Sequence, residues 1–98
     1  MAVVAVFQGP TLTQQQYEQS INRLTGGKKN RMESPTDWPV EGLLAHIAGP
    51  GQGGFRVVDV WDSEDSFRRF GDQLMPILRE LGIDVQPDIY PAHAFVSA

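Results

Sequence analysis

Two stretches of this chain are apolar on both sides of an extended backbone, and they constrain its fold more than any other feature. Residues 2–8 read AVVAVFQ, and residues 55–62 read FRVVDVWD. Successive side chains of a strand point to opposite faces, so apolar residues at both odd and even positions predict a strand buried on both faces. Both stretches are therefore expected in the middle of a sheet.

Capping and turn signals place a helix and a hairpin between these two stretches. Thr11 and Thr13 each precede a Gln by three residues, so either can open a helix, and Gly26-Gly27 ends it. Residues 43–48 (LLAHIA) predict a second strand, in which His46 alternates with Leu44 and Ala48 and shares their face. A glycine-rich turn joins this strand to residues 55–62 as an antiparallel hairpin.

A second helix and a last strand complete the order. Ser63 is a good N-cap for a second helix, in which apolar residues recur every three or four positions. Gly82 ends this helix. Residues 89–96 predict a final strand, and it belongs at an edge because Pro91 has no N–H to donate.

The order strand, helix, strand, strand, helix, strand predicts an α+β, ferredoxin-like βαββαβ fold over residues 1–98 as a single domain. In this fold a four-stranded antiparallel sheet has both helices on one face, with the first and third strands in the centre. The helices leave the second apolar face uncovered, and soluble monomers rarely expose such a patch. A homodimer is therefore expected, with two sheets packed face to face as a dimeric α+β barrel.

Composition narrows the environment and the partners. With 41% hydrophobic and 20% charged residues the chain is typical of a globular protein, and without cysteine it can form neither a disulfide nor a thiolate metal site. The longest apolar stretch is too short to span a bilayer and lacks the pattern of a signal peptide, so a cytoplasmic protein without a membrane partner is expected. A net charge of −4 argues against nucleic acid as a partner.

One segment carries a family resemblance. Residues 54–64 (GFRVVDVWDSE) form a strand that ends in Trp and leads into an acidic helix start, and Phe67 and Phe70 follow. With Leu74-Met75-Pro76 and residues 91–93 (PAH), this pattern resembles the dimeric α+β barrel superfamily, and within it the small antibiotic-biosynthesis-monooxygenase-like proteins of its uncharacterised branch.

The resemblance implies a pocket between the sheet and the helices, with Trp61 at the position of an aromatic residue that relatives often carry. The superfamily includes cofactor-free oxygenases, haem-degrading enzymes, lactone isomerases and polyketide cyclases, so a shared fold decides little about the reaction. The cofactor-free oxygenases tend to place an Asn near the substrate, whereas the asparagines here are Asn22 and Asn30, on the predicted first helix and in the loop after it.

Two polar residues on the predicted strands are candidates for chemistry. His46 lies in an apolar strand, where an imidazole can act as general base or be a packed, hydrogen-bonded core or interface histidine. Asp59 lies between two valines of a central strand, and a buried carboxylate needs a partner. His46 or an arginine can supply it, but a slip of one residue in the hairpin register would place His46 and Asp59 on opposite faces.

Aromatic residues are candidates for the lining of a binding site. Trp61 is the main candidate for a stacking wall, and helical spacing makes Phe67 and Phe70 typical of core packing as well. His93, on the last strand, is expected at an interface. Tyr17 and Arg56 are further polar groups that a pocket could contain. The predicted substrate-binding residues are Trp61, Trp38, Phe67, Tyr17 and Tyr90.

No cofactor or metal is expected. The glycines of residues 49–54 lead into a strand, whereas a phosphate-binding loop must lead into a helix, so they predict a turn. Haem-degrading relatives present their iron ligand on a helix, and neither histidine of this chain lies on a predicted helix.

The sequence leaves two functions open. One is a cofactor-free monooxygenase or proton-abstracting isomerase or cyclase that acts on an aromatic or polyketide-like compound. The other is a non-catalytic ligand-binding or stress-associated dimer.

Overall fold

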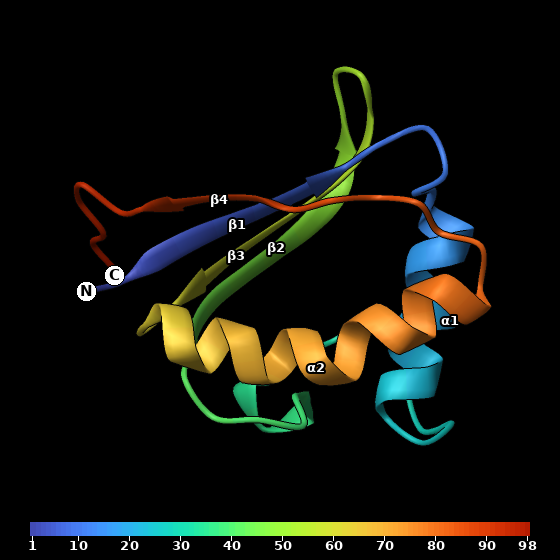
Figure 1. Cartoon of the computed structure of the whole chain (residues 1–98), viewed down its shortest axis with the longest axis horizontal. Coiled ribbons are helices and arrows are strands. Elements are labelled where there is room, and N and C mark those ends of the chain that lie inside the picture. The colour runs from blue at the N-terminus through green and yellow to red at the C-terminus, as the bar shows by residue number, and fades with distance from the viewer.

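A computed structural model describes all 98 residues, and Figure 1 shows their arrangement. The elements follow the predicted order: β1 (Val3–Gln8), α1 (Gln14–Leu24), β2 (Leu43–Gly51), β3 (Gly54–Trp61), α2 (Glu64–Glu80) and β4 (Asp88–Pro91), with a short 3-10 helix, η1 (Pro35–Asp37), before β2. The strands form one antiparallel sheet in the order β2-β3-β1-β4. The predicted α+β, ferredoxin-like fold with β1 and β3 in the centre is confirmed.

The caps that start the helices are those the sequence predicts. Thr13 accepts a hydrogen bond from the N–H of Gln16 at the start of α1, and Ser63 accepts one from the N–H of Ser66 at the start of α2. Gly26 has a φ of 66° just after α1, and Gly82 has a φ of 72° just after α2. This left-handed conformation suits glycine and ends each helix.

One face of the sheet forms the core with both helices. Val3, Ala5 and Phe7 of β1 and Val57 and Trp61 of β3 belong to a buried cluster that also contains residues of α1 and α2. The alternate residues of these strands lie on the opposite face, which carries no helix. Neither helix is long and apolar enough to cross a membrane.

The hairpin differs from the sequence expectation at its outer end. The register between β2 and β3 shifts between Leu43 and Ala45, so Leu43 lies opposite Trp61 and packs against the core. The expectation that Leu44 shares the face of His46 is therefore wrong, because this bulge takes Leu44 out of alternation and leaves it 47% exposed. The glycine-rich segment is a turn, as expected, with Gly51 opposite Gly54.

The last strand is shorter than predicted. β4 pairs with β1 from Asp88 opposite Val6 to Pro91 opposite Val3, and it lies at the edge as expected. Residues 92–96, predicted as strand, lie beyond it, and only the hydrogen bond from the Ala92 N–H to the Ala2 carbonyl continues the pairing past Pro91. The predicted strand over residues 89–96 is therefore wrong beyond Pro91.

Candidate functional site

The register of the hairpin brings the two candidate polar residues together. His46 of β2 lies directly opposite Asp59 of β3, on the face that packs against the helices. The His46 Nδ1 atom is 2.6 Å from Asp59 Oδ1. The side chains of His46 and Asp59 are only 11% and 3% exposed, so this hydrogen bond lies inside the protein, where it is stronger than in water.

Tyr17 extends this pair into a chain of three polar groups. Its hydroxyl group is 2.7 Å from His46 Nε2. Because an ionised carboxylate only accepts hydrogen bonds, His46 donates its Nδ1 proton to Asp59 and accepts the Tyr17 proton at Nε2. Burial raises the pKa of the Tyr17 phenol, the backbone of Met32 acts in the opposite direction, and the charge of Asp59 adds to the increase.

Aromatic rings hold the imidazole in place from two sides. The His46 and Tyr17 rings lie nearly parallel, at 17°, with centroids 5.9 Å apart. The indole ring of Trp38 meets His46 edge-on, with centroids 4.7 Å apart. The imidazole is therefore fixed by two hydrogen bonds and two ring contacts.

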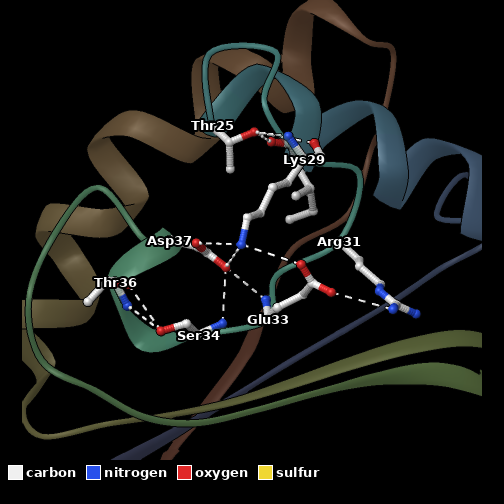
Figure 2. Close-up of polar contacts among 8 residues, drawn as sticks. Thr25, Lys29, Arg31, Glu33, Ser34, Thr36 and Asp37 are labelled. Carbon is white, nitrogen blue, oxygen red and sulfur yellow. Dashed lines mark hydrogen bonds and ion pairs between the residues drawn. The ribbon is translucent and has the colours of Figure 1, made fainter.

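Trp38 follows a loop that is held by an ionic network, and Figure 2 shows the residues of this network. The Lys29 ammonium group is 3.1 Å from the Asp37 carboxylate and 3.4 Å from that of Glu33. Asp37 also accepts hydrogen bonds from the backbone N–H groups of Glu33 and Ser34, which cap η1. The Glu33 amide and the Lys29 ammonium hold the pKa of Asp37 below its usual value of 3.8. Because Trp38 follows Asp37 directly, the network positions it.

Three basic residues at and after the end of α1 form ion pairs. Lys29 pairs with Asp37 and Glu33, Arg31 is 3.4 Å from Glu33, and Arg23 is 2.9 Å from Glu80 on α2. The bond between Lys29 and Asp37 raises the pKa of the lysine above 10.5.

A small apolar cavity lies between the sheet and the helices, against the three polar groups. Its volume is about 40 Å³, and 11 of its 14 lining residues are hydrophobic. The lining residues used below are Tyr17, Trp38, His46 and Asp59. Tyr17 and His46 also line a surface groove of about 500 Å³, with Arg31, Met32 and Phe55 among its walls. The two spaces therefore meet at the Tyr17–His46 hydrogen bond.

Three of the predicted lining residues lie elsewhere. Trp61 is fully buried and stacks on Phe70, with ring centroids 5.0 Å apart, and Phe67 meets it edge-on. Since α2 begins three residues after Trp61, its first turns fold back onto the indole and fill that end of the core. Tyr90 is 45% exposed because Ile89 and Pro91 take the helix-facing positions of β4.

The asparagines form a separate contact. The Asn22 amide donates a 3.3 Å hydrogen bond to Asn30, outside the cavity lining. No group of three or more His, Asp or Glu side chains is arranged to hold a metal ion.

The role of Tyr17 in the polar chain is the part of the site that sequence reasoning missed. The sequence places Tyr17 on the apolar side of α1, which is equally typical of a core tyrosine. The available signal was the hydroxyl group of Tyr17 on the buried side of α1. This helix covers the face of the sheet on which His46 and Asp59 lie.

Comparisons with known proteins support the fold alone. No protein-family model matches the sequence, and no curated protein does. Among solved structures the chain is similar to SnoaB, a cofactor-independent oxygenase from Streptomyces nogalater, with a TM-score of 0.55 and 14% identity over 99% of this chain and 96% of that one. At this identity the likeness shows the fold, and at that level it supports the resemblance drawn from the sequence.

Proposed function

We propose that this chain binds an apolar, aromatic or polyketide-like compound and abstracts a proton from an acidic carbon of it, without metal or flavin. The observation that supports the proposal is the His46–Asp59 hydrogen bond at the wall of an apolar cavity. Proton abstraction begins isomerase and cyclase reactions and cofactor-free oxygenations alike. SnoaB, a cofactor-independent oxygenase, has the same fold.

In this function His46 supplies the base and Asp59 orients it. Asp59 accepts the Nδ1 proton, which leaves the lone pair of Nε2 on the side of Tyr17 and the cavity. When Nε2 takes a proton, the carboxylate stabilises the imidazolium that forms. A positioned base of this kind contributes about 10²–10⁴-fold to a rate.

The ligand reaches this base from the surface groove. A cavity of about 40 Å³ is far smaller than the usual range for ligand sites, about 300–1,000 Å³, whereas the groove of about 500 Å³ falls within it. Tyr17 and His46 line both spaces, so an aromatic ring in the groove lies next to them. Trp38 forms the inner wall.

The functional unit is a homodimer in which the helix-free faces of two sheets meet. This face carries exposed or half-buried apolar side chains: Val4, Ile47, Val58, Val60 and Tyr90. Ile47 alone is 68% exposed, and a continuous apolar patch of this kind is rare on soluble monomers.

Sedimentation velocity over a range of dilutions tests the dimer. We expect the wild-type chain to sediment as a dimer and Ile47→Lys or Val60→Lys as a folded monomer, because each places a charge in the interface. Gln73→Lys, an exposed change on α2 with the same gain in charge, is the control and stays dimeric. A wild-type monomer at all concentrations contradicts the dimer.

A second function, ligand binding without turnover, is favoured by the size of the cavity. The space between sheet and helices is nearly filled, so a ligand stays in the groove, and the largely buried His46–Asp59 pair need not take part in a reaction. In this case the groove is the binding site and the polar chain holds the fold together.

Turnover of 5-nitrobenzisoxazole separates the two functions. This small aromatic compound loses a carbon-bound proton to a base and opens to a coloured cyanophenolate. We expect the wild-type protein to accelerate the opening and His46→Ala, if folded by circular dichroism, to lose at least about 10²-fold. His93→Ala removes the other histidine, which is exposed, and keeps the rate. Saturable binding without acceleration supports the non-catalytic function.

A further inference from the structure

We propose that Tyr17 is the residue that exchanges a proton with the bound molecule, and that His46 and Asp59 act behind it as a relay. This inference rests on the proposed function and deepens it. Without Tyr17, His46 would be the group that meets the ligand.

Both nitrogen atoms of His46 are already engaged. Nδ1 is 2.6 Å from Asp59 and Nε2 is 2.7 Å from the Tyr17 hydroxyl group. An imidazole has no third nitrogen to offer a ligand. Both residues line the groove, but the Tyr17 hydroxyl group occupies the lone pair of His46, so a molecule in the groove exchanges a proton with His46 through Tyr17.

The rings around His46 restrict direct access further. Trp38 covers the imidazole edge-on and Tyr17 lies beside it, and only 11% of the His46 side chain is exposed. Tyr17, on α1, lines both the cavity and the groove and is itself only 7% exposed, so the order of the proton transfers is set by the hydrogen bonds rather than by exposure.

The proton transfers balance without any further reactant. In an isomerisation a carbon–hydrogen bond of the ligand breaks, its proton passes to the Tyr17 oxygen, and the electron pair stays on the ligand as an enolate. The phenolic proton of Tyr17 moves at the same time to His46 Nε2, and Asp59 stabilises the imidazolium. The reverse transfers deliver a proton to a different carbon of the same molecule and restore Tyr17 and His46.

The electrostatics of Tyr17 explain why a relay is needed. Burial raises the pKa of the phenol, so a free phenolate does not accumulate near neutral pH. The phenol can accept a proton only as it gives its own away, and His46 is the acceptor within hydrogen-bond distance. The backbone of Met32 lowers the pKa and so stabilises the charge that develops on the oxygen.

Solvent isotope effects on the opening of 5-nitrobenzisoxazole test the relay. The carbon-bound proton passes to Tyr17, the nitrogen–oxygen bond breaks to leave the charge on the cyanophenolate, and the proton on His46 returns to water. In the relay the phenolic proton, which exchanges with solvent, moves in the same step, so the wild-type rate falls in D₂O. If His46 removes the proton directly, no solvent-derived proton moves and the rate is unchanged.

Tyr17→Phe provides the second measurement. We expect the variant to keep its fold, to lose at least about 10²-fold in rate, and to show no solvent isotope effect on the activity that remains. Ser97→Ala, which removes an exposed hydroxyl group far along the chain from the site residues, keeps both the rate and the isotope effect.

The outcomes separate this inference from the proposed function. A wild-type protein without any acceleration overturns the proposed function and the relay with it. Acceleration that depends on His46 but is equal in wild type and Tyr17→Phe, or lacks a solvent isotope effect in the wild type, overturns the relay alone. Loss of both the rate and the isotope effect in Tyr17→Phe supports it.

Discussion

Asp59 and Trp61 are two residues apart on β3, point to the same face, and are the largest fully buried side chains of the protein. Their surroundings are opposites. Asp59 hydrogen-bonds His46 beside a small cavity, whereas Trp61 is packed against Phe67 and Phe70. The helix-facing side of the sheet therefore has a polar region around Asp59, here called the polar end, which Tyr17 of α1 joins, and a filled apolar region around Trp61, here called the apolar end.

The apolar end contributes to stability, whereas the polar end carries the groups that could take part in a reaction. At the apolar end burial itself is stabilising, at about 25 cal/mol per Å² of apolar surface. At the polar end, removing a carboxylate and an imidazole from water is costly, and hydrogen bonds only offset that cost. Substitutions at the two ends should therefore differ in kind as well as in size.

Trp61→Ala should have the largest effect on stability. Removing a fully buried indole leaves a cavity, and the free energy of unfolding should fall by about 4 kcal/mol. The indole Nε1 has no hydrogen-bond partner, so no polar interaction is lost. Urea denaturation measures the change. Trp61→Phe, which keeps a ring against Phe70, should cost less than half as much; equal losses would show that Trp61 is not held by packing.

His46→Leu should have the next largest effect on stability, and a second substitution at Asp59 should reverse the loss. Leaving the Asp59 carboxylate buried without its partner should lower the free energy of unfolding by about 3 kcal/mol. Adding Asp59→Leu should restore stability to within about 1 kcal/mol of the wild type, because apolar residues often replace a buried polar pair without loss. Activity should stay absent in the double variant. A double variant as unstable as His46→Leu would show that the polar end, like the apolar end, loses stability whenever its native side chains are replaced.

The sequence predicts the apolar end better than the polar end, for physical reasons. The apolar side chains at odd and even positions of β1 and β3 can be recognised from residue type, and with the order of the elements they are enough to define the fold. The pairing of His46 with Asp59 depends on which residues form the turn, and the glycines of residues 49–54 leave that register open. The bulge between Leu43 and Ala45, next to Gly42, changes the parity of β2 only beyond this pair.

Tyr17 and Trp61 illustrate a second limit. The angle at which a helix crosses the sheet decides which of its buried residues meets the cavity. The periodicity of the helix sequence does not predict that angle. Trp61 therefore becomes core while Tyr17 joins the polar chain. Trp38 reaches the site through a loop whose shape comes from the Lys29–Asp37 pair, a contact between residues eight apart.

Tyr17→Phe tests the polar end with a smaller change. Losing one hydrogen bond should lower the free energy of unfolding by about 1 kcal/mol at neutral pH. Because folding raises the pKa of Tyr17 above 10.0, the fold favours the neutral phenol, and its contribution is present below that pH and lost as pH rises through the folded value. Stability should therefore fall less steeply above pH 10.0 in the variant. Parallel pH curves for the two proteins would contradict this.

Asp37→Asn should have the smallest effect, because it acts on the loop that carries Trp38 and on neither end of the sheet. The pKa of Asp37 is lowered by the Glu33 amide and by Lys29, so its contribution to stability is present above its ordinary value of 3.8 and is lost as pH falls through the folded value. Thermal unfolding should show a modestly lower Tm for Asp37→Asn at neutral pH, and the difference should vanish in acid. Glu33→Gln, which removes the more exposed partner of Lys29, should change Tm less. The nuclear Overhauser contact between Trp38 and His46 provides a second measurement. If it weakens in Asp37→Asn and persists in Glu33→Gln, the loop network positions Trp38 at the polar end. If it is unchanged in both variants, the core alone holds Trp38.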